Sequence, residues 1–367
     1  MRIIFCKKKW GRIVFFLILS GCTFAIRTPV TPVRPTVKPH IFRCVFHAHT
    51  QYSHDSKASL DFVIKTARQA DLDFVVVTDH NNMNGLEPYR QMKAPDRPLL
   101  IFGTEFSTWH EGHLTGIGIK QAPPDIEKTQ EVVDLFHKEG GYAVISHPLS
   151  RRKPWPTWEL KDFDGIEVFT FSDIFYADGI ALLPKALFFP PKVFLESVLK
   201  NRSFPALQLW SDQLNSGRHI AAYGATDAHL KFEWHGLTIE NYLLLFQSVT
   251  TYALADELKE EKIIEALGHG KSFIAFEVWG LAQDFTFTAS QEGENFKMGD
   301  TIPVGVPVTF SVSAPKKAEI RLIRDGRVIE TKNVSDLKVQ TSQRGVYRVE
   351  VYENGTIWII SNPIYVE

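Results

Sequence analysis

Histidines and carboxylates recur in this chain in short clusters, and each cluster lies at the edge of an apolar run. Two clusters are doublets with a spacing of two, namely His47 with His49 and Asp227 with His229. Residues two apart on an extended strand point to the same side, so each doublet can present two side chains to one ion. Imidazole and carboxylate groups suit zinc, manganese and iron alike. The doublets therefore predict a metal site.

Other residues of the same types stand singly beside further apolar runs. Asp55 follows the first doublet, His80 and Glu105 end the second and third runs, His113 opens the fourth, and His147 ends the fifth. The carboxyl ends of parallel barrel strands meet on one face, where active sites are built. Nine such side chains on one face would crowd together unless cations neutralised them. We therefore expect a centre that binds several divalent metals.

Strand-like and helix-like segments alternate from about residue 41 to about residue 280, which favours an α/β barrel or a doubly wound sheet. The region 184–214 is rich in proline and aromatic residues and gives no clear pattern, and one interpretation is an insertion that covers the site. The predicted strands are 41–46, 74–78, 99–103, 114–119, 142–146, 165–170 and 219–224. The predicted helices include 60–70, 129–139, 192–200 and 257–268.

The pattern changes after about residue 281, where segments alternate in polarity or are rich in β-branched residues and no helix is evident. Asp325-Gly326 and Asn354-Gly355 are strong hairpin signals, because both residues of each pair tolerate positive φ angles. Residues 281–367 are therefore expected to form a small antiparallel β-sandwich.

The N-terminus has the composition of an export signal. Five basic residues precede or border a short apolar run at 13–19, and Leu19-Ser20-Gly21-Cys22 follows it. This ending resembles the lipobox of bacterial lipoproteins, which implies that residues 1–21 are removed and Cys22 is lipidated. The proline-rich residues 22–40 would then tether an exported body to the membrane, on the periplasmic or outer-surface side. A plain signal peptide or an uncleaved anchor is the alternative.

Charge and cysteine content limit the class of partner. The chain of 367 residues has a net charge of -1, which falls to about -6 once the five basic residues of the signal segment are removed. No nucleic-acid partner is expected for so acidic a body. Only Cys44 would remain as a free thiol, so no intrachain disulfide can form, and we expect Cys44 to pack as a small buried hydrophobe.

The order HxHT, SxD, TDH, GxE, GHLxGxG, SHP and TDxH resembles the PHP (polymerase and histidinol phosphatase) family of metal-dependent phosphoesterases. The resemblance covers roughly residues 43–280 and implies a distorted (β/α)7 TIM-like barrel over 41–280, with two to three divalent ions of zinc, manganese or iron. It assigns one metal to His47, His49, Glu105 and Asp227, a second to Asp55, His80 and His229, and a third to Glu105, His113 and His147.

Some positions have competing neighbours. The family spacing selects Asp55 over His54, and the residues after His113 favour it over His110. Asp79 either orients a ligand or caps a turn. The histidines without a motif around them are interpreted as surface or packing residues, and these are His40, His137, His219, His235 and His269.

The resemblance implies hydrolysis of a small-molecule phosphate ester by a metal-activated hydroxide held at the His47, His49, Glu105 and Asp227 site. Arg151, Arg152 and Lys153 directly follow the fifth run and are candidates for binding the phosphate, although an ordinary solvated basic loop is equally consistent with them. Arg43 is expected to make a structural contact. Two alternatives stay open: the same centre cleaves a carbamate, ester or amide bond, or the chain is a non-catalytic surface binding protein. The sequence does not predict the substrate.

Overall fold

The computed structural model of the chain describes residues 40–92, 98–156, 158–231, 233–234, 237–238 and 241–367. The predicted signal segment, Cys22 and the tether up to residue 39 lie outside the described residues. Within the described part of the chain, no helix is both long and apolar enough to cross a membrane.

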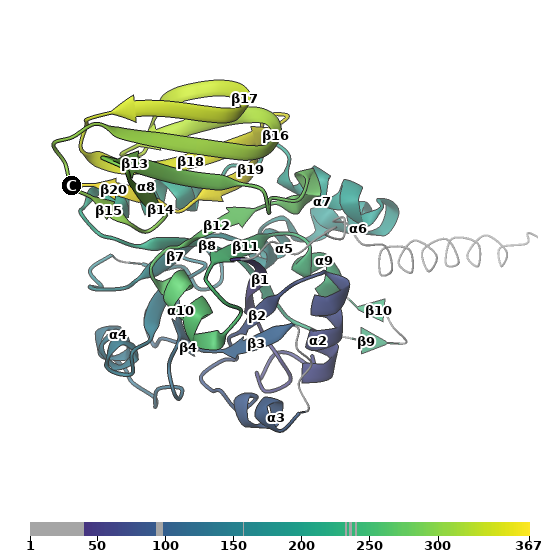
Figure 1. Cartoon of the computed structure of the whole chain (residues 1–367). Coiled ribbons are helices and arrows are strands. Elements are labelled where there is room, and N and C mark those ends of the chain that lie inside the picture. Colours follow the sequence, from purple (N-terminus) through teal and green to yellow (C-terminus); the bar gives the residue numbers. More distant parts are fainter. Residues whose placement is uncertain (1–39, 93–97, 157, 232, 235–236, 239–240) are drawn as a thin grey trace, which may run out of the picture.

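The N-terminal part is a distorted (β/α)7 barrel, as expected (Figure 1). Strands β1, β2 and β3 pair in parallel, and so do β6, β7, β8 and, to close the ring, β1. β3 and β4 occupy one position in the ring, separated only by Gly103. The strands are β1 (Ile41–Ala48), β2 (Phe74–Val77), β3 (Leu99–Phe102), β4 (Thr104–Ser107), β5 (His113–Ile117), β6 (Tyr142–Ser146), β7 (Gly165–Thr170) and β8 (Ala221–Ala228).

The distortion comes from β5, which runs antiparallel to both of its neighbours, β4 and β6. Only residues 108–112 connect β4 to β5, and a parallel crossover needs a dozen residues or more. The reversal places His113, the first residue of β5, opposite Ser107 at the end of β4 and Ser146 at the end of β6. His113 therefore reaches the same end of the barrel as side chains that follow strand carboxyl ends.

The helices surround the barrel and bury one face each. Helix α2 begins after Ser59, whose hydroxyl accepts a hydrogen bond from the amide of Phe62 at 3.2 Å, and it buries Leu60, Val63 and Ile64. The helical spacing of these apolar residues explains why the sequence predicted helix α2. The helices of this part are α2 (Leu60–Gln69), α3 (Leu86–Gln91), α4 (Thr129–Lys138), α9 (Tyr242–Phe246) and α10 (Glu260–Gly268), and two short strands are β9 (Glu233–Trp234) and β10 (Leu237–Thr238).

The region without a clear sequence pattern is helical. It contains α6 (Leu183–Phe188), α7 (Pro191–Leu199) and α8 (Pro205–Asn215), and it is preceded by α5 (Phe171–Asp178) and a 3₁₀ turn (Gly179–Leu182). Helix α8 contacts β7, and its fully buried Trp210 donates a hydrogen bond to the carbonyl of Ile220 at 3.1 Å. Part of the region is therefore an ordinary barrel helix and not an insertion.

The C-terminal part consists of strands with a core of their own, which includes Phe287, Phe310 and Tyr347. Both predicted hairpins are confirmed, because Asp325-Gly326 and Asn354-Gly355 form the turns and have positive φ angles. All pairs are antiparallel except β15 with β20. The strands are β13 (Thr286–Gln291), β14 (Glu294–Lys297), β15 (Thr301–Ile302), β16 (Val308–Arg324), β17 (Arg327–Thr341), β18 (Gly345–Glu353), β19 (Thr356–Ser361) and β20 (Ile364–Val366).

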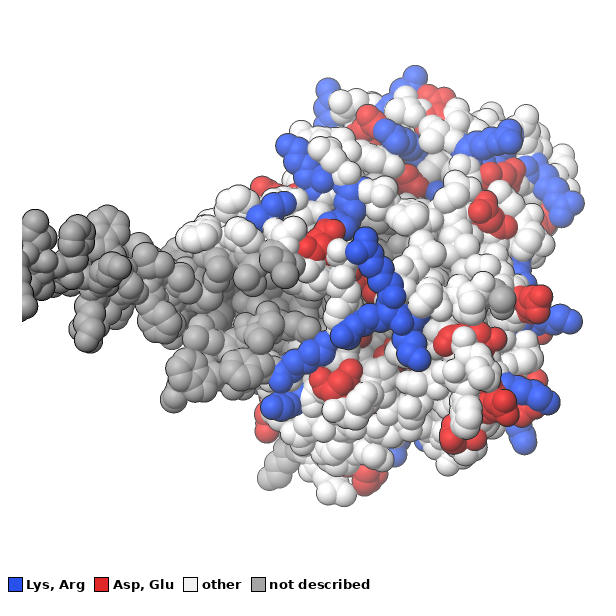
Figure 2. Space-filling model, turned by 180° about the vertical axis from the view of Figure 1, so that it is seen from behind, with Lys and Arg blue, Asp and Glu red and all other residues white. Residues whose placement is uncertain are grey.

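Two strands that the sequence did not predict join the two parts. β11 (Thr250–Leu254) pairs with β1, β12 (Ser272–Ala275) pairs with β11, and β19 pairs with β12. Barrel and C-terminal strands thus share one hydrogen-bonded sheet, and the domain boundary at residue 280 stays a prediction. Acidic and basic side chains lie close together over the face seen from behind (Figure 2).

Candidate metal centre

The structure brings all nine predicted ligands to one end of the barrel, and seven of them line a cavity of about 560 Å³. They come from β1, β4, β5 and β8 and from the segments that follow β1, β2, β6 and β8. Eight of them fall into overlapping groups whose ligand atoms lie within 4.8 Å of one another, and the ninth, His147, has its Nε2 atom 2.8 Å from Glu105. The nine are His47, His49, Asp55, His80, Glu105, His113, His147, Asp227 and His229.

The group of His47, His49, Glu105 and Asp227 is fully buried or nearly so. The Nε2 atoms of His47 and His49 are 3.0 Å apart, and the His49 Nε2 lies 3.1 Å from Asp227 Oδ1. The His47 Nε2 also lies 3.1 Å from Glu105 Oε2. These four residues are the set that the sequence assigned to one ion.

The other two predicted sets adjoin this group. Asp55 Oδ2 lies 2.9 Å from His229 Nε2 and 3.6 Å from His80 Nε2, and His49 belongs to the same group. Glu105 Oε1 lies 2.6 Å from His113 Nδ1 and 2.8 Å from His147 Nε2. Glu105 thus directs one oxygen toward each of two sets, which is the arrangement of a bridging ligand.

The Glu105 carboxylate tests whether the residues suit a metal. Its Oε2 atom is buried and has no hydrogen-bond partner. It nevertheless lies 3.1 Å, 3.2 Å and 3.4 Å from ring nitrogens of three histidines, His47, His49 and His80. Buried polar atoms are ordinarily hydrogen-bonded, and an unpaired carboxylate oxygen among imidazole nitrogens is what an absent cation leaves. The clusters therefore fit a polynuclear metal site.

Irregular backbone conformations orient several of these side chains toward the centre. His47, His147 and Asp227 have φ angles of 68°, 29° and 49°, which L-residues rarely adopt. The pairing register of β1 with β2 shifts between Val45 and Ala48, so the chain at the first doublet is bulged and not simply extended. The extended-strand argument for that doublet was therefore wrong, although the two imidazoles do meet.

The predicted ligands His113 and Asp55 have surroundings that differ from those of their sequence neighbours His110 and His54. His113 lies in the cluster, whereas His110 is exposed and lies 3.7 Å from Glu127. Asp55 contacts two histidines, whereas His54 is exposed and its ring packs 4.9 Å from that of His80. Asp79 accepts hydrogen bonds from the amide and the hydroxyl of Thr50, both at 2.6 Å, so it supports the turn that follows His49.

Two outer residues that the sequence analysis missed hold the ligands in place. Glu167, on β7, lies 2.6 Å from His47 Nδ1 and accepts a hydrogen bond from the amide of His147 at 2.8 Å. Ser172 donates a hydrogen bond to Asp227 Oδ2 at 2.6 Å. Glu167 left a signal in the sequence, because it is the one charged residue in the apolar strand 165–170. Such partners fix the ring orientation of a ligand histidine.

Strong electrostatic coupling marks the cluster. Burial alone would raise the pKa of Glu105, but the positive charge of His113, His47 and His80 holds that pKa well below its usual range. Burial would lower the pKa of His147, and the hydrogen bond and charge of Glu105 instead raise it to about 9. Neighbouring carboxylates raise the pKa of His47, His80, His147 and His229 despite burial, so without metal the protons on these four histidines supply the positive charge that the carboxylates require.

The basic residues after His147 divide between two cavities. Arg152 and Lys153 line the metal cavity together with Tyr176 of α5, whereas Arg151 lines a neighbouring cavity. The Arg152 guanidinium lies 4.2 Å from the centre of the Tyr176 ring, and Lys231 donates a hydrogen bond to the Tyr176 hydroxyl at 2.5 Å. Phosphate binding by the three residues stays a prediction.

Comparison with known protein families gives a match to one domain family. Residues 46–168 match the PHP domain. The matched segment contains seven of the nine ligand positions, and Asp227 and His229 lie beyond it. The chain thus combines a PHP-domain segment and buried metal-site clusters with an additional C-terminal β-rich region.

Individual proteins resemble the chain more distantly. The uncharacterized protein MJ1587 of Methanocaldococcus jannaschii is 26% identical over 147 residues, which are 36% of this chain and 83% of that protein. A two-domain Bacteroides vulgatus protein with a predicted PHP-like metal-dependent phosphoesterase is 15% identical, with a TM-score of 0.44, over 91% of this chain and 98% of its own. An amidohydrolase of Chromobacterium violaceum is 14% identical, with a TM-score of 0.34, over 51% of this chain and 87% of its own.

Proposed function

We propose that the chain is a metal-dependent phosphoesterase that hydrolyses a small-molecule phosphate ester at a centre of two or three divalent ions. The observation that carries the proposal is the convergence of nine histidine and carboxylate side chains at one end of the barrel, with the unpaired Glu105 oxygen among three imidazoles. His47, His49, Glu105 and Asp227 would hold one ion. Asp55, His80 and His229 would hold a second, and His113 and His147 would share Glu105 around a third.

Bound zinc, manganese or iron would supply Lewis acidity, which polarises a phosphoryl oxygen and makes water nucleophilic at neutral pH. Other residues of the chain hold these ligands in position. Glu167 holds the ring of His47 and the backbone of His147, and Ser172 holds Asp227. The ligand atoms therefore keep their places before the substrate arrives, which lowers the reorganisation that the reaction requires.

The wall of the metal cavity favours a phosphate over a carbonyl substrate. Arg152 and Lys153 both line it, so two cations besides the metals face the space above the ligands. A phosphate monoester carries up to two negative charges and accepts hydrogen bonds at several oxygens, whereas an ester or a carbamate carries no comparable charge. Guanidinium groups bind phosphate through paired hydrogen bonds. We assign Arg152 and Lys153 to the phosphate on this basis.

A substrate screen tests the proposal. The purified chain is stripped of metal, reloaded separately with zinc, manganese or iron, and assayed on para-nitrophenyl phosphate, bis-para-nitrophenyl phosphate and para-nitrophenyl acetate. We expect phosphate-ester turnover with at least one metal, and its loss in Glu105→Ala with the fold retained. Turnover of the acetate alone would support carbonyl chemistry. Binding of less than one metal equivalent per chain would favour a non-catalytic binding protein.

We further propose that the protein is exported and anchored to the cell envelope through a lipid on Cys22, as the ending Leu19-Ser20-Gly21-Cys22 suggests. The chain would then act on substrates outside the cytoplasm. Expression of the full chain in a bacterial host, followed by detergent-phase partitioning, tests this. We expect the wild-type protein in the detergent phase and Cys22→Ser in the aqueous phase or retained as the uncleaved precursor. Wild-type protein in the aqueous phase would contradict lipidation.

A further inference from the structure

A second cavity of about 180 Å³ adjoins the metal cavity, and His147 lines both. The loop 147–153 and helix α5 form the wall between them. Ser150, Arg152 and Tyr176 line the metal side, whereas Arg151 and Asp173 line the second cavity. Because His147 borders both, the second cavity is the adjoining space on this side for a group bonded to a phosphorus atom at the metals.

Part of the second cavity has an apolar, buried lining. Phe169, Ile174 and Ala206 line it and are at most 7% exposed. The Phe169 ring packs 5.6 Å from the ring of Phe204, which also lines the cavity, and 4.8 Å from that of Phe276 in an edge-to-face contact. Such a wall offers no hydrogen bonds to a polyhydroxylated group, whose desolvation would go uncompensated.

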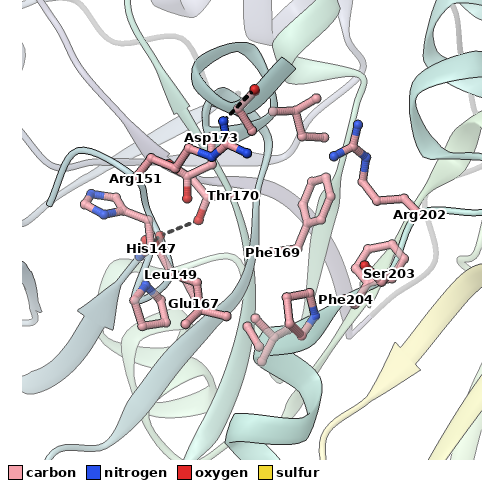
Figure 3. A pocket seen from close by; sticks show the side chains of 16 residues that line it. His147, Leu149, Arg151, Glu167, Phe169, Thr170, Asp173, Arg202, Ser203 and Phe204 are labelled. Atoms are coloured by element: carbon pink, nitrogen blue, oxygen red, sulfur yellow. Dashed lines mark hydrogen bonds between the residues drawn. The ribbon is translucent and has the colours of Figure 1, made fainter. Parts of the chain in front are cut away.

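Several polar groups around the cavity already have partners. Arg151 donates a hydrogen bond to the carbonyl of Ala177 at 3.0 Å, and Arg202 pairs with Asp178. Thr170 donates a hydrogen bond to Glu167 at 2.9 Å. Figure 3 shows the Arg151 and Arg202 side chains on opposite sides of Phe169. Guanidinium groups held in this way can still stack on the face of an aromatic ring.

We propose that the second cavity receives the alcohol part of the substrate and that this part is an uncharged aromatic group about the size of a benzyl group. The inference rests on the proposed function. The volume agrees with this size, because an apolar cavity of about 150 Å³ binds benzene. An anionic substituent on the ring would meet the Asp173 carboxyl as well as Arg151, so a neutral ring fits better.

A pair of tryptophan variants tests the assignment. Ser203 is exposed and lines the second cavity, so Ser203→Trp can fill its mouth without disturbing the core. Gln208, nearby in the sequence on α8, is also exposed but does not line the cavity. Gln208→Trp is therefore the matched control. The substrates are benzyl, cyclohexylmethyl and ethyl phosphate, whose leaving alcohols have similar acidity.

We expect Ser203→Trp to lower kcat/KM for benzyl phosphate at least tenfold, mainly through KM, and to leave ethyl phosphate within twofold. Gln208→Trp should change neither. Wild-type protein should favour benzyl over cyclohexylmethyl phosphate at least threefold. An equal effect of Ser203→Trp on benzyl and ethyl phosphate, or no effect, would overturn the pocket assignment, and equal use of the two ring substrates would overturn its aromatic character. If wild-type protein hydrolyses para-nitrophenyl phosphate but none of the three, the pocket assignment alone is overturned; if it hydrolyses no phosphate ester at all, the proposed function fails as well.

Discussion

Glu167 shows how much of the candidate centre depends on residues that would touch no metal. It is 1% exposed, and its two oxygens contact the His47 ring, the His147 backbone and the Thr170 hydroxyl. A ligand histidine whose second nitrogen meets a carboxylate is fixed in tautomer and orientation and binds metal more strongly. Glu167 is therefore a positioning residue for two of the predicted sets at once.

We expect Glu167→Gln to weaken metal binding, and turnover at limiting metal, by about 10- to 100-fold, because the amide cannot supply the charge that supports His47. Competition with a chelator measures the metal affinity, and excess metal should restore part of the turnover. Glu159→Gln, at an exposed position, is the control. Unchanged metal affinity in Glu167→Gln would show that the residue has only a packing role.

Asp173 leads to a prediction about pH. Burial, with the charges of Asp227 and Glu167, raises the pKa of its carboxyl to about 6, although His147 and Ser150 oppose the shift. The folded state therefore binds this proton more tightly than the unfolded state, whose carboxyl titrates near 3.9. The stability from this group is complete below about pH 4 and is lost as the pH rises toward 6.

In metal-free protein, Asp173→Asn should therefore be more stable than wild type at pH 7, by about 1–3 kcal/mol, with a smaller difference at pH 4. Thermal unfolding in EDTA at a series of pH values measures this difference. Asp256→Asn, at an exposed position, controls for a general effect of removing a carboxylate. A difference that does not change between pH 4 and pH 7 would be inconsistent with a raised pKa at Asp173.

At the residue scale, the sequence predicted which histidines and carboxylates come together in the structure. Histidine, aspartate and glutamate at the edges of apolar runs can be recognised from the local sequence alone. It did not predict Glu167 or Ser172, since a lone charge or hydroxyl in a strand or helix does not reveal its partner. Nor did it predict that His47, His147 and Asp227 have positive φ angles, which depend on the pairing of neighbouring strands.

At the scale of elements, a buried polar network holds β1 to β11 on the barrel flank. Arg43 of β1 pairs with Glu277, which also accepts hydrogen bonds from Tyr252 and, at 3.2 Å, from Thr250. Arg43 and Glu277 are each 1% exposed. The expected structural role of Arg43 is thus confirmed, and neither residue belongs to the metal cavity.

Glu277→Gln should destabilise the fold by about 3–5 kcal/mol, because it removes the fully buried charge that faces Arg43 and leaves only the partly exposed Asp71, 3.2 Å away, as its acidic partner. Denaturant unfolding measures the loss. Glu353→Gln is the control, since Glu353 pairs with Lys316 at 3.0 Å in a partly exposed position and its loss should cost about 1 kcal/mol or less. Equal losses in the two variants would contradict the account of the buried pair.

Apolar runs and turn residues predicted most strand positions, and strands 142–146 and 165–170 have the bounds that the sequence indicated. The reversal of β5 was not predicted, because strand direction is set by pairing with β4 and β6 and not by local composition. In the C-terminal part, residues 308–324 form one long strand, β16, whose pairing register with β17 shifts between Ser313 and Ala318.

At the scale of the whole molecule, the barrel and the C-terminal strands are bound together by more than the β12–β19 pair. Asn362, 1% exposed, accepts a hydrogen bond from the Ala222 amide at 2.7 Å and donates to the Ser272 hydroxyl at 2.8 Å. The C-terminal Tyr365 stacks on His219 with ring centres 3.9 Å apart. These contacts depend on the assembled fold, so the sequence could not show them.

Asn362→Ala should cost about 2–4 kcal/mol of stability, because the Ala222 amide and the Ser272 hydroxyl lose a buried partner. Unfolding should follow a single transition if the two parts fold together. Asn333→Ala, at an exposed position on β17, should cost little. A loss no larger than that of the control, or two separate transitions in wild-type protein, would show that the two parts are energetically independent.

The central claim is that the nine-residue cluster is a metal centre that hydrolyses phosphate esters, and phosphate release as a function of bound metal tests it most directly. The purified chain is stripped with chelator and titrated with each metal, with metal per chain and phosphate release measured in the same samples. We predict no release from the stripped protein and a rise that saturates at two to three equivalents per chain. Release that persists without metal, or its absence from every phosphate ester tried at full loading, would contradict the claim.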